Sequence, residues 1–597
     1  MKKLHLPQLR GNFRLGVWCL LCILTLLIFL YPAHLNYQYA IIQSLDIFPH
    51  LQLFSILFTV WFGMILALLF FRERKQRVQE WENIALLGIF ILVFSGIWVS
   101  LTDGNNGEYL AYAAQAKNIV DMGRVPGVLQ SISTTDFPGL PLLLSGIRLV
   151  TGFETSNGMF VLLILNMLLY STFLYLLFRC LVKDPFLASL GTLIVIIGVR
   201  ETAQFIPNFH PRGFALVLFS ALLVLLFSKY RQPNGGRIVS NVVLFIILFA
   251  ALTITHLVTA LVFIIILMSI YLLGRYSKKN LIEFPLVTLC TITILTWLTY
   301  FAISTDTSLV NIISTNIRDL FGTQIVSSYL VNMTSSYFGA VGTPVWVDLI
   351  RYFWLALVLA PGSIVALINL FKVRNLSQMD IALLGGVVGL GIFVVLTLIE
   401  SGLVEGFRAL FYLPLFSVPI IFGFLSIRGN FVKRFVPAIL LVIILALSVP
   451  TFLVHNDRVG IAAIYPQEIS TSKFLSSCYG NGEALNIVGD SSTDRQILLD
   501  MPEANYESFL SYTEENEDQV WSGLALLVKD FESPGESYNN SLFLYSGRLA
   551  SNFTYLFRVD PTSDPKWQLL NETLNQNSLI YNNGMMEVYY TKVGNNG

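Results

Sequence analysis

The chain has 597 residues, of which 55% are hydrophobic and only 12% are charged. An ordinary soluble domain carries about 25% charged residues, so this composition excludes a chain that is soluble throughout. Its 37 basic and 37 acidic residues give a net charge of zero, and the basic ones form no continuous stripe, which excludes a nucleic-acid partner.

Apolar segments fill the first three quarters of the chain. About 20 apolar residues are enough to cross a hydrocarbon layer about 30 Å thick. Segments near this length occur at 15–32, 51–71, 84–101, 158–178, 186–199, 213–228, 239–255, 257–274, 284–303, 352–371, 381–400, 409–426 and 435–454. They predict a polytopic α-helical membrane protein with about 13 transmembrane helices. Two of them meet at His256, where one broken helix is an alternative.

The basic residues predict the orientation of these spans. Of the 29 Lys and Arg residues in 1–454, 21 fall on alternate connections if the N-terminus is cytoplasmic, as the positive-inside rule requires. The first span is expected to be an anchor, because the YPAHLNYQYA that follows it offers no small-x-small cleavage site of a signal peptide. An odd number of spans then places the C-terminus outside. We therefore expect a multi-pass protein in the bilayer of the plasma membrane.

The last part of the chain, 455–597, reads as a separate water-soluble domain. It holds 19 acidic and 8 basic residues, and strand-like stretches alternate with helical ones. The expected strands are 484–488, 524–528, 579–581 and 587–591. The last two are expected to form a hairpin turned by Asn582, Asn583 and Gly584. The prediction is a transmembrane domain over 1–454 followed by a C-terminal extracytoplasmic α/β domain.

Two long outer loops are expected, at 102–157 and 304–350, and the first carries the candidate catalytic acids. Asp103 and Glu108 lie at its start, at the membrane surface. A carboxylate there can act as a general base on an acceptor hydroxyl, and two carboxylates can hold a divalent cation such as Mg²⁺ or Mn²⁺. Alternatively, Asn105 and Glu108 have the spacing of a helix N-terminus with a capping acid, which gives Glu108 a structural role only.

The sequence after Glu108 predicts two helices within the first loop. One face of the first helix carries Tyr109, Ala113, Ala116 and Val120. Gly123 can end this helix, because glycine readily adopts the left-handed conformation of a C-terminal cap. A second, apolar helix is expected after Pro138 and Pro141, leading back to the membrane.

Three outer segments place polar residues just before an apolar helix. The first has Glu108 and Tyr109, a small-residue helix ending in Gly-x-x-Pro, then FPGLPLLL and a closing Thr-Gly. The second is ETAQFIPNFHPRGFALVLF, which contains His210 and Arg212, and the third is GFRALFYLPLFSVPIIFG, which contains Arg408. Together they resemble C-fold glycosyltransferases, which are multispan enzymes that use polyprenyl-phosphate or dolichyl-phosphate sugars as donors. The stretch LIYNNGMMEVYY is similar to the closing hairpin of such proteins.

The resemblance implies an enzyme that transfers a hexosyl or pentosyl group to a lipid, glycan or protein acceptor at the outer face. It implies catalysis by Asp103 and Glu108, and substrate binding by Tyr109, His210, Arg212 and Arg408. The chain departs from the family pattern where Gly107 precedes Glu108, since many members have adjacent Asp-Glu there. The loop also follows the third span instead of the first. The WWDYG signature of oligosaccharyltransferases is absent from the sequence, so transfer of a whole glycan to asparagine is not expected.

Arg408 is also a candidate without the resemblance, because it directly precedes an apolar run. A guanidinium at headgroup depth can bind the two free oxygens of a phosphate diester. Alternatively, it can extend to the lipid headgroups or pair with Glu405.

Two other classes of function fit a polytopic protein. A secondary transporter or flippase needs polar residues near the middle of the membrane, and the spans contain almost no charged ones. The sequence also has no GxxxxGK[ST] pattern for ATP-driven transport. The other alternative is a non-enzymatic membrane assembly factor whose C-terminal domain binds a partner.

Overall fold

The computed structural model describes two sets of residues. In the first three quarters of the chain these are 48–70, 85–91, 107–123, 137–153, 155–182, 184–198, 210–231, 238–279, 281–300, 360–400, 412–426 and 439–446. In the remainder they are 466–479, 486–490, 505–510, 541–546, 565–576, 578–582 and 586–591. Residues 16, 20–25, 27, 83 and 436 are also described.

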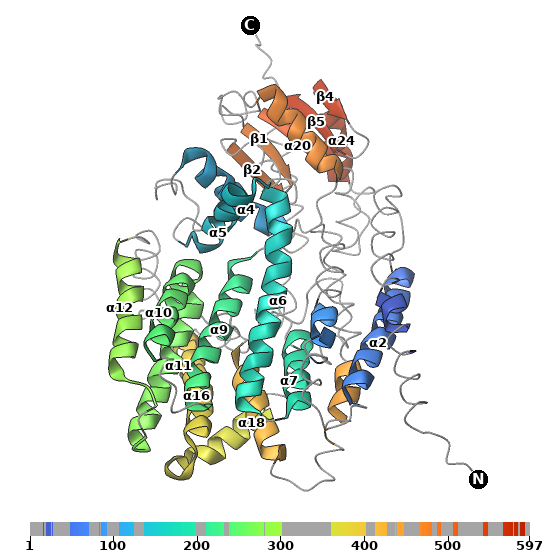
Figure 1. Ribbon diagram of the computed structural model, residues 1–597. Coiled ribbons are helices and arrows are strands. Elements are labelled where there is room, and N and C mark those ends of the chain that lie inside the picture. Colours follow the sequence, from blue (N-terminus) through green and yellow to red (C-terminus); the bar gives the residue numbers. More distant parts are fainter. Residues whose placement is uncertain are drawn as a thin grey trace, which may run out of the picture.

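The first part of the chain is a bundle of helices (Figure 1). Its labelled helices are α2 (Phe48–Phe70), α4 (Gly107–Met122), α5 (Gly139–Thr151), α6 (Thr155–Leu181), α7 (Pro185–Gly198), α9 (Pro211–Arg231), α10 (Ile238–Thr255), α11 (Leu257–Tyr276), α12 (Phe284–Tyr300), α16 (Gln378–Glu400) and α18 (Pro414–Ser426). Within the described residues, four helical stretches are long and apolar enough to cross a membrane: Val161–Leu181, Pro211–Ser228, Leu257–Tyr276 and Gln378–Leu396. The protein is thus a helical membrane protein, while the predicted total of 13 spans stays a prediction.

The chain reverses direction at His256. The ring of Phe263 lies 5.9 Å from the rings of both Phe245 and Phe249, which precede the reversal by a similar number of residues. Such contacts require α10 and α11 to run antiparallel. His256 itself has an extended backbone, with φ of −158° and ψ of 106°. The alternative of one broken helix is therefore wrong.

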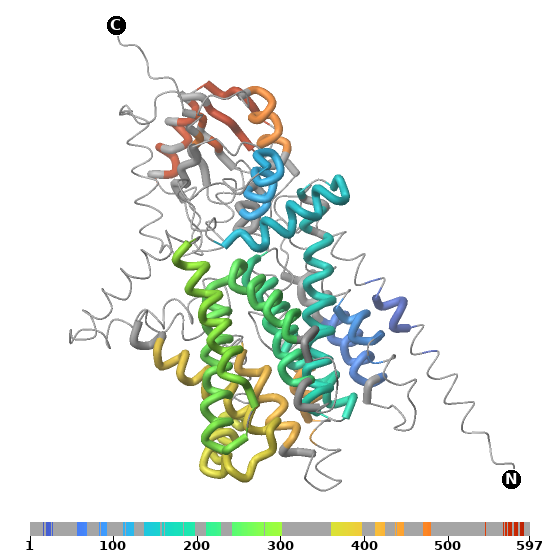
Figure 2. Tube along the Cα trace, turned by 60° about the vertical axis from the view of Figure 1, so that its left-hand side comes forward, coloured from blue at the N-terminus to red at the C-terminus, as the bar shows by residue number. Residues whose placement is uncertain are grey.

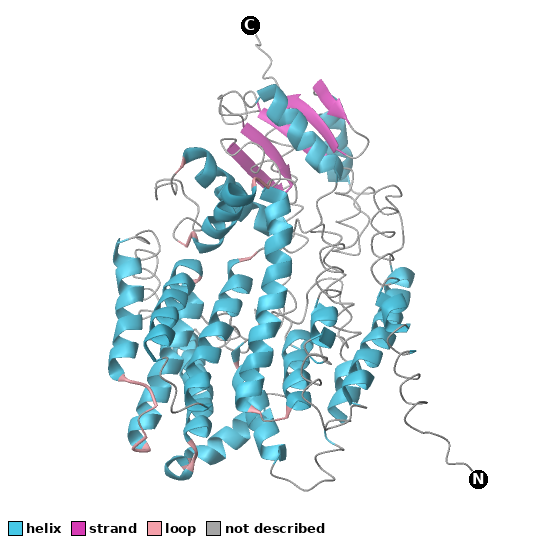
Figure 3. Ribbon diagram, viewed as in Figure 1, coloured by secondary structure: helices cyan, strands magenta, loops and turns pink. Residues whose placement is uncertain are grey.

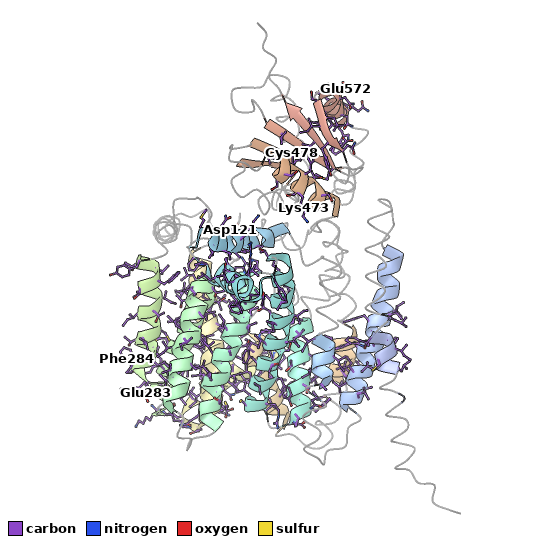
Figure 4. All side chains as sticks on the ribbon, turned by 45° about the horizontal axis from the view of Figure 1, so that its top comes forward. Asp121, Glu283, Phe284, Lys473, Cys478 and Glu572 are labelled. Atoms are coloured by element: carbon purple, nitrogen blue, oxygen red, sulfur yellow. The ribbon has the colours of Figure 1, made fainter. Side chains whose placement is uncertain are left out.

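The bundle has two distinct ends. At one end, the turn after α11 meets the turn before α16: the ammonium of Lys279 donates to the carbonyl of Leu376, and the guanidinium of Arg374 lies 5.2 Å from the centre of the Tyr276 ring. At the other end lie α4 and α5, together with the start of α9 and the α10–α11 turn (Figures 1 and 2). Figure 4 marks the two ends by Glu283 and Asp121.

Glycines on α16 allow close approach of two neighbouring helices, with the backbone of α11 and with a side chain of α18. A Cβ added at Gly385 or Gly389 would lie 2.8 Å from the Cα of Ile270 or Ile266 on α11. A Cβ at Gly386 would lie 2.2 Å from the ring of Phe416 on α18. Small residues at a helix interface permit such approach, which supplies the packing energy that drives association of apolar helices.

Gly389→Ala is expected to destabilise the protein by about 1–3 kcal/mol, because its methyl group overlaps the backbone of α11. Gly391→Ala is the matched control, since a Cβ there meets nothing within 4 Å. The control gains the helix propensity of alanine without the clash. Thermal unfolding of the two purified variants in detergent measures the difference, and equal melting temperatures would contradict this packing.

The C-terminal part contains a five-stranded mixed sheet, drawn in magenta in Figure 3. Its strands are β1 (Asn486–Asp490), β2 (Asn505–Leu510), β3 (Ser541–Ser546), β4 (Ser578–Asn582) and β5 (Met586–Thr591), in the order β2-β1-β3-β5-β4. β1 is parallel to β2 and β3, and β5 is antiparallel to β3 and β4. The predicted hairpin is confirmed by the β4–β5 pairing, and β1 overlaps the predicted 484–488 strand. The predicted 524–528 strand lies outside the described residues.

Helices α20 (Pro466–Tyr479) and α24 (Pro565–Gln576) accompany the sheet. Leu475 of α20 is buried with Ile487, Leu542 and Val588 of the strands. Phe474 stacks on Tyr581, with ring centres 4.3 Å apart. Figures 1 and 2 place this sheet beyond the end of the bundle that carries α4 and α5. The predicted domain boundary at 455 and the outer location of the domain remain predictions.

Candidate functional site

The candidate site is the end of the bundle that α4 and α5 cover. α4 begins at Gly107 and ends at Met122, and Gly123 follows with a φ of +65°, so the predicted end of this helix is confirmed. Glu108 and Tyr109 therefore belong to the first turn of α4. Their side chains lie outside the description. An acidic residue in the first turn of a helix is favoured by the helix dipole, so this position agrees with a structural role as well as a catalytic one.

The two loop helices form a small packing unit of their own. Ala113 and Ala116 of α4 are buried against Leu140 and Leu144 of α5. Ser145 of α5 donates its hydroxyl to the carbonyl of Ala116 at 3.0 Å. The predicted small-residue face of α4 is thus the face that packs on α5. The predicted second helix is also present, but it begins at Gly139, directly after Pro138, so Pro141 lies in its first turn and not before it.

An exposed ion pair joins the C-terminal ends of α4 and α5. A guanidinium nitrogen of Arg148 on α5 lies 3.7 Å from a carboxylate oxygen of Asp121 on α4, with the side chains 28% and 52% exposed. Such a pair contributes little to stability, because water screens it. The relative placement of α4 and α5 therefore comes mainly from their buried contacts.

His210 caps the start of α9. Its Nδ1 accepts a hydrogen bond from the backbone N–H of Arg212 at 2.9 Å, and its carbonyl accepts from the N–H groups of Gly213 and Phe214. Pro211 occupies the first position of the helix, where its missing N–H costs no hydrogen bond. The sequence His210-Pro211-Arg212 is therefore a helix start as well as a candidate binding motif.

Tyr112 connects α4 to this helix start. Its ring meets the ring of His210 edge-on, with centres 6.0 Å apart and planes at 70°. Position 108 lies one helical turn before Tyr112, on the same side of α4. The structure thus brings the turn of α4 that contains Glu108 near the His210–Arg212 segment, although the two are about a hundred positions apart in the sequence. Arg212 is half-buried there, and its Nε atom is buried.

The start of α5 docks on the α10–α11 turn. A Cβ at Gly139 would lie 2.4 Å from the hydroxyl oxygen of Thr255 and 2.9 Å from its Cα. Only glycine fits this contact without a shift of the backbone. The FPG segment of the first loop is thus in direct contact with the last residue of α10.

A buried hydrogen-bonded chain runs inward from the same turn. His256 caps α11, since its Nδ1 accepts from the N–H of Thr259 at 3.3 Å and contacts the Thr259 hydroxyl at 2.9 Å. The Thr259 hydroxyl also lies 2.6 Å from the hydroxyl of Tyr412, just before α18. The Tyr412 ring packs on Phe219 of α9, with ring centres 4.7 Å apart. α9, α11 and the start of α18 therefore meet at these hydrogen bonds.

The predicted site residues are described to different extents. The structure gives the side chains of His210 and Arg212 and only the backbone of Glu108 and Tyr109. Asp103 and Arg408 lie outside the described residues, so their roles stay predictions. Among the side chains that the structure describes, no three His, Cys, Asp or Glu residues come together as a metal site. The predicted carboxylate ligands, Asp103 and Glu108, are not among those side chains.

Three residues of the site were not predicted: Tyr112, Thr259 and Tyr412. Tyr112 follows Glu108 by four residues, and Tyr412 follows Arg408 by four residues. An aromatic residue four positions after a candidate charged residue was the available signal in both cases. Thr259 carries no such signal, because its partner Tyr412 is 153 positions away in the chain.

No protein-family model matches the sequence, and no curated protein matches it. Solved structures of similar shape include archaeal oligosaccharyltransferase AglB from Archaeoglobus fulgidus in complex with an inhibitory peptide and a dolichol-phosphate. It has 13% identity and a TM-score of 0.48, covering 87% of this chain and 75% of that one. The apo form of the Archaeoglobus fulgidus enzyme gives 12% identity and 0.48 over the same shares.

ArnT from Cupriavidus metallidurans bound to undecaprenyl phosphate gives 9% identity and a TM-score of 0.45, covering 86% of this chain and 98% of that one. These matches are similarities of shape between chains of low sequence identity.

Proposed function

We propose that the protein is a membrane glycosyltransferase that moves a sugar from a polyprenyl-phosphate donor to a lipid, glycan or protein acceptor at the outer face. The observation that carries the proposal is the contact between Tyr112 and His210. It joins the turn of α4 that contains Glu108 to the polar start of α9, at one end of an apolar bundle. A lipid-linked donor enters such a site from the bilayer, and a polar acceptor reaches it from the water.

The proposed reaction is a direct displacement at the anomeric carbon of the donor sugar. The acceptor hydroxyl forms a bond to that carbon while the bond from the carbon to the phosphate oxygen breaks. Polyprenyl phosphate leaves with the bonding electron pair. The acceptor proton passes to the carboxylate of Glu108 or Asp103, acting as a general base.

A basic side chain is needed where negative charge grows on the departing phosphate. Arg408 and Arg212 are the proposed groups, because a guanidinium donates two parallel hydrogen bonds to phosphate oxygens. Tyr109 and His210 are proposed to contact the substrate as well, next to these two arginines. Nδ1 of His210 is already committed to the α9 cap, so any contact of this ring with the substrate uses Nε2.

A divalent cation is proposed to be held by Asp103 and Glu108 if the reaction requires one. Carboxylate oxygens are the ligands that Mg²⁺ and Mn²⁺ prefer. Held there, such an ion would supply positive charge that favours departure of the phosphate.

A panel of radiolabelled donors tests the proposed function. The purified protein is incubated with undecaprenyl-phosphate and dolichyl-phosphate sugars and a mixture of lipid, glycan and peptide acceptors. Label should leave the donor and appear on one acceptor class, and nucleotide sugars should give no transfer. If every donor remains intact while the same protein in liposomes carries out ion-coupled uptake, the transporter alternative replaces the enzyme.

Limited proteolysis tests the proposed orientation in the membrane. Protease added to intact cells should remove the part of the chain after about residue 456 and leave the basic 72–77 connection protected. Addition of detergent should expose both. Protection of the C-terminal part until detergent is added would place Glu108 and His210 on the cytoplasmic side.

A further inference from the structure

The hydrogen-bonded chain at the α10–α11 turn has a defined direction. Because Nδ1 of His256 accepts from the backbone N–H of Thr259, this nitrogen carries a lone pair and the ring proton is on Nε2. The Thr259 hydroxyl must then donate to Nδ1 across the 2.9 Å contact. Its oxygen is left as an acceptor, so the Tyr412 hydroxyl donates to it at 2.6 Å. The donated protons therefore point from the Tyr412 hydroxyl to Thr259, and from the Thr259 hydroxyl to Nδ1 of His256.

The hydrogen bond between Thr259 and Tyr412 is shielded from solvent. Thr259 is 0% exposed and Tyr412 is 4% exposed. Hydrogen bonds in such surroundings are stronger than in water, and they fix the groups that they join. Thr259 is therefore well placed to hold the start of α18 against the cap of α11.

The same turn also holds the outer loop. Thr255, immediately before His256, receives the start of α5 at Gly139 in a contact too close for any side chain. α5 in turn packs on α4 through Leu140 and Leu144. One short turn thus contacts the loop that contains the proposed catalytic acid on one side and the start of α18 on the other.

We propose that Thr259 is a positioning residue, whose hydroxyl fixes the start of α18 relative to the α4–α5 loop and thereby sets the affinity for the lipid-phosphate donor. This inference rests on the proposed function. Its physical basis is covalent linkage, because Tyr412 follows the proposed phosphate-binding Arg408 by only four residues in the sequence. Thr259 itself contacts no substrate.

Four substitutions separate the hydroxyl from the packing. Thr259→Val and Tyr412→Phe each remove one hydroxyl and keep the shape, and Thr259→Ser keeps the hydroxyl. Thr253→Val is the matched control, because Thr253 is also buried on this hairpin but donates only within its own helix, to the carbonyl of Phe249 at 3.0 Å. Thermal unfolding in detergent and binding of undecaprenyl phosphate, measured by titration, are the readouts besides sugar transfer.

The double-mutant cycle tests the link itself. Thr259→Val and Tyr412→Phe should each lower the melting temperature, and the double variant should lie no lower than the worse single variant, because both changes break the same bond. Thr259→Ser should restore the wild-type value. Strictly additive losses would show that the two hydroxyls are not coupled and would overturn the proposal.

The binding measurement tests positioning. Thr259→Val should weaken binding of undecaprenyl phosphate and raise the donor KM by about 2- to 30-fold, with kcat nearly unchanged, since coupling through a packed network is typically of this size. Thr253→Val should bind like the wild type. Unchanged affinity in Thr259→Val would leave a structural bond only. If the wild type neither binds lipid phosphate nor transfers sugar, the proposed function fails, whereas a non-additive cycle still establishes the link between the helices.

Discussion

Glu108→Gln and Asp103→Asn are each expected to reduce sugar transfer by about 100-fold, the usual contribution of a general base or of a ligand to an essential metal ion. Both substitutions keep the shape of the side chain and remove only its charge and its capacity to take up a proton. The melting temperature of the purified protein should therefore stay close to that of the wild type. Initial rates with the best donor of the panel measure the loss.

Asp121→Asn is the control for these two variants. Asp121 is an acid of the same helix as Glu108, but it lies near the far end of α4 in a solvent-exposed pair with Arg148. Its loss should leave transfer nearly unchanged. If Glu108 only caps α4, glutamine should be tolerated there, with full activity and a stability loss well under about 1 kcal/mol. Wild-type rates in both Glu108→Gln and Asp103→Asn would remove the catalytic assignment.

The helices of the first outer loop could be predicted because their signals are local. Small residues recur at helical spacing from Ala113 to Ala116, and they are buried against α5 as that spacing requires. Gly123 ends α4 with the positive φ that glycine readily adopts. The β4–β5 hairpin was predictable for the same reason, since an Asn-Asn-Gly turn between two short apolar runs is a short-range signal.

The role of the histidines could be predicted only in part. The sequence predicts His210 in an outer segment and His256 between two apolar segments, but the hydrogen bonds that occupy their Nδ1 atoms are features of the folded backbone. Each ring accepts from the first turn of the helix that follows it. A histidine before an apolar helix is therefore a structural cap as well as a candidate ligand, and the two roles are compatible because the ring has a second nitrogen.

Contacts between distant segments could not be predicted. The Thr259–Tyr412 bond spans 153 positions, and neither residue departs from the composition of an ordinary apolar helix. The close contact of Gly389 with α11 could not be predicted either. Gly389 and Gly391 are both glycines among apolar residues, but only Gly389 contacts α11. Helices in a membrane are apolar on every side, so the periodicity that identifies the packed face of a soluble helix is weak here.

Replacement of Arg408 is expected to separate two roles that a basic residue can have at a membrane surface. An arginine that only reaches the lipid headgroups, or pairs with Glu405, can be replaced by lysine without loss, because charge and length are sufficient. A guanidinium that holds a phosphate through two parallel hydrogen bonds cannot, because an ammonium group is a point charge. Arg408→Lys should therefore raise the KM for the donor and leave acceptor saturation unchanged.

Arg408→Ala should cost more, about 2–5 kcal/mol of donor binding, because a phosphate withdrawn from water is then left without its partner. Since about 1.4 kcal/mol corresponds to a factor of ten, the donor KM should rise by roughly 30-fold or more. Arg148→Lys is the control, because Arg148 lies on α5 in an exposed ion pair. Three superimposable donor saturation curves for the wild type, Arg408→Lys and Arg408→Ala would make Arg408 a membrane anchor.

A donor KM that rises from the wild type to Arg408→Lys and again to Arg408→Ala, with Arg148→Lys at the wild-type value, would instead identify a phosphate-binding arginine four residues before Tyr412. Tyr412 is the residue through which Thr259 is proposed to hold the start of α18. If Arg408 binds the phosphate in this way, Thr259→Val should therefore shift the donor saturation curve in the same direction as Arg408→Lys.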